Sequence, residues 1–233
     1  MKILIVGGAG YIGGYLTDIL NKNKYNVTVY DNLLYENRYL KDINFVYGDV
    51  SNFSKINKLL RKKFDVIIWL AALVGDGACA TNPELTKLIN YDSVINMLKN
   101  FNGKIIYMST CSVYGQSKTL INENSKQKPL SLYAKTKIDS EKAITSKFNN
   151  SCIFRLGTLY GIGDNISRIR LDLVVNILTM KAALGQSLEV FGGNQWRPLL
   201  HVRDVTYAIL FAIENDVKGT FNISDKNYKI KDL

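Results

Sequence analysis

The chain has 233 residues, of which 47% are hydrophobic and 21% are charged, so it can bury a substantial core. No apolar run approaches the roughly 20 residues that cross a membrane, and the amino terminus has the pattern of a strand and not of a cleavable leader. We therefore expect a cytoplasmic protein that does not bind a membrane.

The cysteine, histidine and basic residues exclude several kinds of site. Cys79, Cys111 and Cys152 are widely separated and show no C-x-x-C spacing, so neither a disulfide framework nor a zinc site is expected. The single histidine, His201, excludes histidine-rich metal sites. The formal net charge of +10 comes from basic residues spread along the chain, with only short clusters such as residues 61–63. This spread argues against a nucleic-acid partner, although the charge would attract a phosphorylated substrate.

The first segment predicts a dinucleotide-binding turn. An apolar strand at residues 2–6 leads into glycines at positions 7, 10 and 13, and a helix with apolar residues at helical spacing runs from Tyr11 to about Leu20. Gly7 allows the turn, Gly10 allows a pyrophosphate to approach the backbone, and Gly13 allows the helix to pack closely on the sheet.

The next predicted strand, Val27–Tyr30, ends at Asp31. A carboxylate at this distance from the glycines binds the ribose 2′-hydroxyl of a dinucleotide and repels the additional phosphate of NADP. We therefore expect the cofactor NAD.

Strands and helices continue to alternate, which predicts a doubly wound parallel α/β sheet, the Rossmann fold. Further strands are expected at residues 45–47, 66–70, 104–108, 152–155 and 220–223, and a new element at Tyr228. Helices are expected at residues 54–61, 83–101 and 131–147, and an apolar helix at 171–184 follows a charged loop at 163–170. We expect an NAD-binding domain at residues 1–160 and a smaller, incomplete substrate-binding lobe at residues 161–233, interleaved with the end of the sheet.

Thr110, Tyr133 and Lys137 form a candidate site for hydride transfer. Tyr133 and Lys137 are four residues apart on a predicted helix, so their side chains share one face. A free phenol has a pKa of about 10, and a nearby ammonium favours the phenolate that removes a proton from a sugar hydroxyl. A second match with this spacing begins at Tyr114, but a glycine follows it and the segment is a predicted loop.

The chain resembles the extended short-chain dehydrogenase/reductase family, in its branch of nucleotide-sugar epimerases and dehydratases, such as UDP-glucose 4-epimerase-like proteins. The resemblance extends over nearly the whole chain. It rests on residues 7–13, Gly48-Asp49-Val50, Leu70-Ala71-Ala72, residues 109–115, Tyr133 with Lys137, residues 155–161 and residues 197–205.

The resemblance implies roles for individual residues. Thr110, Tyr133 and Lys137 take the family's catalytic positions. The cofactor is expected to contact Gly7, Gly10, Tyr11, Ile12, Gly13, Asp31, Asn32, Asp49, Val50, Leu70, Ala71, Ala72, Asn90, Ser109, Tyr133 and Lys137. The substrate is expected to contact Asp76, Thr158, Arg168, Arg170, Asn176 and Arg197, of which the last matches the family's arginine for the substrate diphosphate. His201 is expected to be structural.

Two departures from the family pattern bear on the reaction. Family 4,6-dehydratases carry an Asp-Glu pair after the catalytic threonine, whereas this chain has Cys111-Ser112, so epimerisation through a transient 4-keto sugar is preferred to dehydration. Thr158 replaces the asparagine of the best-known galactose epimerases, and residues 73–76 and 168–176 resemble a sub-branch with oxidoreductases acting at C4. A net C4 dehydrogenase is therefore an alternative, and a non-catalytic NAD-binding protein is another.

The resemblance also bears on length and assembly. Family members normally continue further than Leu233, so the chain is expected to be a truncated form. They typically form homodimers through two helices of the Rossmann half, so a homodimer is expected.

Overall fold

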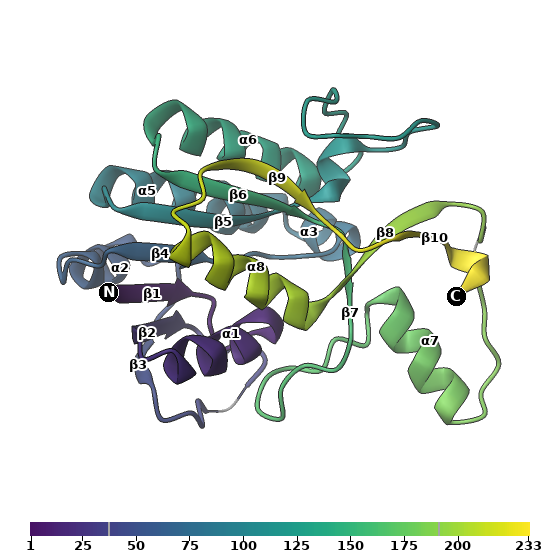
Figure 1. Ribbon diagram of the computed structural model, residues 1–233, viewed down its shortest axis with the longest axis horizontal. Helices are drawn as coiled ribbons and strands as arrows, with labels where there is room; N and C mark the ends of the chain where they lie inside the picture. Colours follow the sequence, from purple (N-terminus) through teal and green to yellow (C-terminus); the bar gives the residue numbers. More distant parts are fainter. Residues whose placement is uncertain (37, 191) are drawn as a thin grey trace.

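The computed structural model describes residues 1–36, 38–190 and 192–233, and its centre is a seven-stranded parallel sheet. The strands are β1 (Lys2–Val6), β2 (Asn26–Asp31), β3 (Asn44–Tyr47), β4 (Val66–Trp69), β5 (Lys104–Thr110), β6 (Ser151–Leu156) and β9 (Gly219–Ile223). Their order across the sheet is β3-β2-β1-β4-β5-β6-β9 (Figure 1). Strands β2 and β3 are added on one side of β1, and β4 and the later strands are added on the other, so the strand order reverses between β1 and β4. This topology confirms the doubly wound fold and creates a crevice at the carboxyl ends of the strands.

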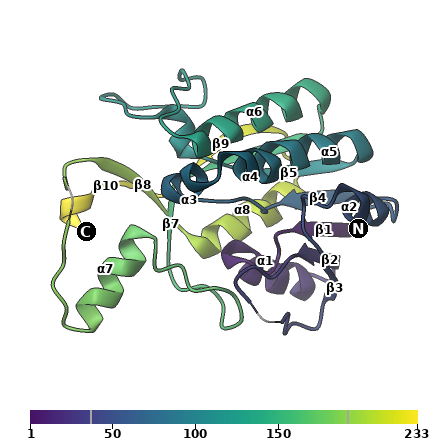
Figure 2. The same ribbon diagram turned by 180° about the vertical axis from the view of Figure 1, so that it is seen from behind.

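Helices cover both faces of the sheet. They are α1 (Tyr11–Lys22), α2 (Phe53–Leu60), α3 (Asp76–Thr81), α4 (Pro83–Lys87), α5 (Ser93–Asn100), α6 (Leu132–Lys147), α7 (Val174–Ala183) and α8 (Val202–Glu214). Helices α1 and α8 pack on one face, and α2, α5 and α6 pack on the other, as the two opposite views show (Figures 1 and 2).

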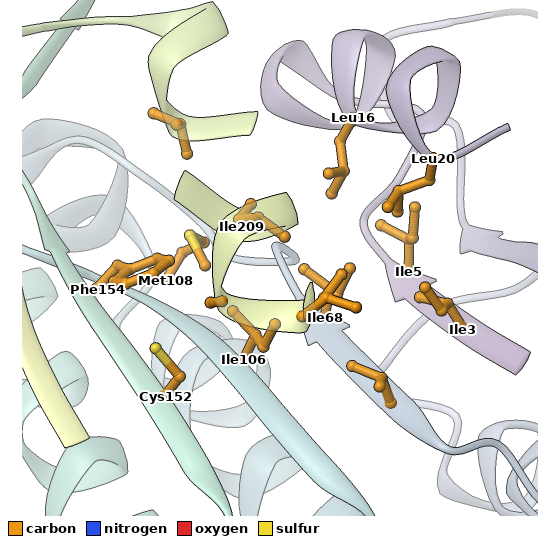
Figure 3. Close-up of a cluster of buried hydrophobic side chains, with 14 of the residues drawn as sticks. Ile3, Ile5, Leu16, Leu20, Ile68, Ile106, Met108, Cys152, Phe154 and Ile209 are labelled. Atoms are coloured by element: carbon orange, nitrogen blue, oxygen red, sulfur yellow. The ribbon is translucent and has the colours of Figure 1, made fainter. Parts of the chain in front are cut away.

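The strands are apolar on both faces because both faces are buried. In β1, Ile3 and Ile5 lie in the cluster formed with α1 and α8, whereas Leu4 and Val6 lie in the cluster formed with α2 and α5. Figure 3 shows the first cluster, in which Leu16 and Leu20 of α1 and Ile209 of α8 meet strand residues such as Ile68 and Ile106. The continuous apolar runs in the sequence follow from this two-sided burial.

Some predicted elements differ from the observed ones. The helix expected at 83–101 is divided by a π-helical turn, Leu88–Asp92, between α4 and α5. Helix α3 and helix α8 are not among the predicted elements, and neither is the second sheet. That sheet has the order β10-β8-β7, from β10 (Asn227–Lys229), β8 (Trp196–His201) and β7 (Thr158–Tyr160). β7 and β10 have three residues each, too few for a period-2 pattern to identify them.

The two halves of the chain share the central sheet. Strand β9 follows residue 160 by almost sixty positions, yet it pairs in parallel with β6 from Cys152–Gly219 to Leu156–Ile223. Helix α7, in contrast, has no buried residue and stands away from the sheet beside β7 (Figure 1). The domain boundary at residue 160 stays a prediction. Within the described residues, no helix has the length and apolar character to cross a membrane.

Replacement of Ile209 by alanine tests the packing of α8 on the sheet. Ile209 is fully buried, so Ile209→Ala is expected to lower the free energy of unfolding by about 3 kcal/mol through lost burial and an unfilled cavity. Tyr207→Ala on the same helix is the control, because Tyr207 is 58% exposed and its loss is expected to change stability by less than about 0.5 kcal/mol. Urea unfolding followed by circular dichroism measures both, and equal losses would contradict the described packing.

Candidate active site

A cleft of about 430 Å³ lies at the carboxyl ends of the parallel strands. Its lining includes Gly7 after β1, Asp31 at the end of β2, Leu70 after β4 and Thr110 at the end of β5. Tyr133 and Lys137 of α6 line the same cleft. The predicted cofactor residues and the predicted catalytic residues therefore share one space.

The glycine turn forms the floor of this cleft. Gly7 has φ +83°, and a Cβ there would lie 2.5 Å from the backbone nitrogen of Ala71. At Gly13, a Cβ would lie 2.3 Å from the carbonyl oxygen of Gly8. Gly10 is the N-cap of α1 and offers no side-chain acceptor to the first N–H groups of that helix. These features fit a pyrophosphate, because open N–H groups at a helix N-terminus favour an anion.

Asp31 and Asp49 fix the rim of the cleft beside this turn. The carboxylate of Asp31 accepts hydrogen bonds from the N–H groups of Leu33, at 2.8 Å, and Ala9, at 3.0 Å, although burial raises its pKa above the ordinary value. Asn32 donates to the Asp49 carboxylate at 2.6 Å. Burial opposes ionisation of Asp49, but hydrogen bonds from Ser51 and Asn32 lower its pKa overall. The arrangement suits recognition of the adenosine ribose by a fixed carboxylate.

The candidate catalytic residues come from β5 and α6. Lys137 is buried, and its Nζ donates to the carbonyl oxygen of Met108 at 2.9 Å. The same Nζ lies 4.7 Å from the ring centre of Tyr107 and 5.9 Å from that of Tyr133. Thr110 ends the strand next to this group, so a hydroxyl, a phenol and an ammonium lie together at one edge of the sheet.

Burial changes the proton affinity of this group. It lowers the pKa of Lys137 to about 8 and raises that of Tyr133 above its ordinary value of 10, although the Thr110 hydroxyl opposes the latter shift. The Tyr133 phenol therefore stays protonated in the protein alone. A further positive charge in the cleft, such as an oxidised nicotinamide, would favour the phenolate.

Three of the residues predicted for the substrate line the cleft. Arg168 stacks on the ring of Tyr35, with its guanidinium carbon 3.8 Å from the ring centre, and Arg170 makes two 2.7 Å hydrogen bonds to Asp172. Thr158 lies on the wall behind the end of β6. These residues extend the cleft beyond the dinucleotide turn.

Two predicted cofactor residues lie behind the wall of the cleft. Asn90 is in the π-helical turn, and its amide holds both backbone groups of Leu73, at 2.8 and 3.0 Å. Ser109 points away from the cleft and donates to Glu141. The structure therefore gives both side chains partners within the protein in place of a position in the lining.

Three predicted substrate residues are also outside the lining. The Asn176 amide binds backbone groups of Gly161 and Arg170, which fixes the loop before α7. Asp76 is exposed at the start of α3. Arg197 is exposed in β8, where its charge opposes the rise that burial causes in the pKa of Cys111.

The cleft also includes residues that were not among the predicted site residues. These are Ala9, Tyr30, Leu33, Leu34, Tyr35, Glu36, Gly48, Leu73, Val74, Gly75, Ile89, Met108, Leu156, Gly157, Leu159, Asp172 and Leu173. Many lie at the carboxyl ends of parallel strands or in the loops that follow them, and that position was the available sequence signal.

Gly13→Ala tests the close approach in the turn. The added Cβ would lie 2.3 Å from a backbone oxygen, so the turn must shift and the affinity for NAD is expected to fall at least about tenfold. Gly77→Ala is the matched control, because no described atom lies within 4 Å of a Cβ there. Calorimetric titration of the cofactor-free proteins measures both, and unchanged affinity in Gly13→Ala would refute the role given to this glycine.

The lowered pKa of Lys137 predicts how stability depends on pH. Between the folded pKa of about 8 and the ordinary value of 10.5, the unfolded chain binds more protons at this lysine than the folded one. The stability of the wild type relative to Lys137→Met is therefore expected to rise by about 3 kcal/mol as pH increases through this window. Lys135→Met, at an exposed position of the same helix, should show no such trend. Urea unfolding of the three cofactor-free proteins across the window tests this, and a constant difference would contradict it.

Comparisons with known proteins agree with this geometry. A model of the NAD-dependent epimerase/dehydratase family matches residues 3–224. A putative UDP-glucose 4-epimerase from Methanocaldococcus jannaschii is 33% identical over 233 aligned positions, covering 91% of this chain and 73% of the relative.

Two solved structures are also similar over almost the whole chain. Pal from Bacillus thuringiensis has a TM-score of 0.90 at 25% identity, covering 100% of this chain and 80% of that one. UDP-glucuronic acid 4-epimerase from Bacillus cereus, solved with UDP-glucuronic acid and NAD, has a TM-score of 0.84 at 26% identity, covering 99% of this chain and 80% of that one. The chain thus belongs to the NAD-dependent epimerase/dehydratase family, and it is an enzyme whose cofactor is NAD.

Proposed function

We propose that the enzyme epimerises a nucleoside diphosphate sugar at C4. The observation that carries this proposal is the single cleft in which Thr110, Tyr133 and Lys137 lie next to the dinucleotide turn. The names of two similar proteins support it, because the relative from M. jannaschii is described as a 4-epimerase and so is the solved protein from B. cereus. Homodimer formation and residence in the cytoplasm stay predictions.

The residues of the cleft have separate tasks in this reaction. Tyr133, as the phenolate, removes the proton of the C4 hydroxyl and later returns it, and Thr110 donates a hydrogen bond to the same oxygen. Lys137 supplies positive charge that stabilises the phenolate. NAD held by the glycine turn and Asp31 would supply reversible hydride transfer at C4 to either face of the sugar. No net oxidation results, so the protein must hold the 4-keto sugar while it rotates.

The chemistry of the cleft supports an anionic substrate. Arg168 and Arg170 line its outer part, and a guanidinium binds phosphate oxygens through two parallel hydrogen bonds. Arg197, whose charge acts on Cys111 next to Thr110 in the chain, is our candidate for the diphosphate. UDP-glucose and UDP-glucuronic acid appear in the names of the relatives, so uridine diphosphate sugars are the first substrates to test.

The side chains beside Thr110 favour epimerisation over 4,6-dehydration. Elimination of water needs an acid and a base next to the sugar. Cys111 occupies the position after Thr110, and burial raises its pKa, so the thiol stays neutral and is a poor base. Ser112 uses its N–H to bind the Thr110 hydroxyl at 3.2 Å.

The proposal is tested by proton NMR of the NAD-loaded enzyme in D₂O with UDP-, GDP-, CDP- and dTDP-hexoses and heptoses. The expected product is a C4 epimer without deuterium at C4, because the hydride returns from the cofactor without exchange with solvent. A keto product with stoichiometric NADH would instead establish a net C4 dehydrogenase, and absence of turnover with every sugar would contradict the proposal.

Tyr133→Phe tests the proton-transfer role. Loss of the phenol is expected to lower kcat at least about a hundredfold while NAD affinity changes less than about threefold. Tyr207→Phe is the control, because Tyr207 is exposed on α8 outside the cleft. Steady-state kinetics and calorimetry measure these values, and full turnover in Tyr133→Phe would remove Tyr133 from the mechanism.

A further inference from the structure

A buried ion pair lies directly behind the candidate catalytic residues, and the proposed reaction does not use it. Glu141 of α6 and Arg155 of β6 are 4% and 7% exposed. Arg155 donates to the Glu141 carboxylate through NH2 at 2.7 Å and through Nε at 3.1 and 3.2 Å. The hydroxyl of Ser109 donates to the same carboxylate. Both carboxylate oxygens of Glu141 thus accept hydrogen bonds from groups inside the protein.

The pair adds to a set of contacts between β5 and α6. Residues 133, 137 and 141 are four positions apart and share one face of the helix. Met108 holds Lys137 through its carbonyl oxygen, and the next strand residue, Ser109, holds Glu141 through its hydroxyl. The following strand residue, Thr110, interacts with the Tyr133 hydroxyl and opposes the rise that burial causes in the pKa of Tyr133. Three consecutive strand residues therefore each contact one residue of this helix face.

Arg155 connects these contacts between β5 and α6 to other parts of the fold. Its NH1 donates to the Tyr114 hydroxyl at 2.7 Å and to the Glu123 carbonyl at 3.0 Å. The Tyr114 hydroxyl donates in turn to Asn222 of β9 at 2.6 Å. Gln127, from the loop before α6, donates to Glu141 at 2.9 Å. The position of α6 along β5 is consequently fixed from β6, β9 and this loop together.

Stability alone is a weak reason for such a pair. Two buried charges lose their hydration, and replacing a buried ion pair by apolar residues is often neutral or stabilising. What apolar residues cannot reproduce is direction, since the carboxylate accepts hydrogen bonds from Ser109 and Arg155 at fixed angles.

We propose that Glu141, held by Arg155, is a positioning residue: it sets α6 against β5 so that Tyr133 and Lys137 stand opposite Thr110. The proposal rests on the C4-epimerase function and deepens it. Glu141 is not among the residues that line the cleft. It acts on the reaction through the two residues that precede it on its helix face.

The test uses the NAD-loaded double variant Glu141→Met/Arg155→Met, which removes both charges and so leaves the net charge behind the site unchanged. The groups that act on the Tyr133 phenol are Cys79, Cys111, Thr110, Arg170 and Lys137, and the double variant substitutes none of them. The pKa of Tyr133 is read from phenolate absorbance as the difference between each protein and its Tyr133→Phe counterpart. Asp216→Asn is the matched control, because it breaks the Lys104–Asp216 pair at the opposite end of β5.

A positioning role predicts a rise of at least about one unit in the Tyr133 pKa, because the phenolate loses its alignment with Lys137 and Thr110. It also predicts that kcat falls at least about tenfold while KM and NAD affinity change less than about threefold. The control should behave as the wild type. A folded double variant with the wild-type pKa of Tyr133 and the wild-type kcat would overturn the proposal.

Two further results keep the test decisive. Ser109→Ala removes the hydrogen bond from Ser109 to Glu141 and keeps both charges. It should therefore shift the Tyr133 pKa and kcat in the same directions as the double variant does. If the double variant does not fold, wild-type behaviour of Ser109→Ala overturns the proposal. The titration of Tyr133 needs no sugar substrate. It therefore still tests the role of Glu141 if the wild type turns over none of the tested sugars, and that failure of turnover would reject the proposed function instead.

Discussion

Burial of the parallel sheet on both faces is the constraint on which the rest of the structure depends. Leu4 and Val6 need a cover on one side of β1, and Ile3 and Ile5 need one on the other, so helices must return on both faces. Parallel strands joined in this way end at the same edge of the sheet. The crevice at that edge is a consequence of the topology, and Gly7 turns the chain directly into it.

The site also depends on the contact between β5 and α6. A phenol and an ammonium at helical spacing acquire chemical meaning only when a strand end lies opposite them. In this structure the carbonyl of Met108 holds Lys137, and Ser109 holds Glu141 through a buried network that reaches β9. The position of Tyr133 and Lys137 in the cleft therefore depends on the buried contacts that α6 makes with β5.

The outer wall of the cleft comes from the loop before α7, and it is fastened to the Rossmann half by polar contacts. Lys41 pairs with Asp164 at 2.6 Å, with both side chains 7% exposed, and the Tyr11 hydroxyl donates to the carbonyl of Gly161. The Asn176 amide of α7 forms hydrogen bonds with the backbone of Gly161 at the start of the same loop. The Lys41 and Tyr11 contacts join segments 120 residues or more apart, and they hold the loop whose Arg168 and Arg170 line the cleft.

The sequence by itself determined the sheet class and the dinucleotide turn, and it predicted the role of Asp31 and the catalytic trio, because strand burial, glycine sterics and helical spacing are local properties. It placed Asn90, Ser109, Asn176, Asp76 and Arg197 in the site from family position alone, and only the tertiary structure decided where their side chains lie. It also did not indicate the Glu141–Arg155 pair or the stacking of Arg168 on Tyr35. Those contacts join residues far apart in the chain or on different elements, and a side chain's partner there is set by how helices and loops pack on the sheet, which no local pattern encodes.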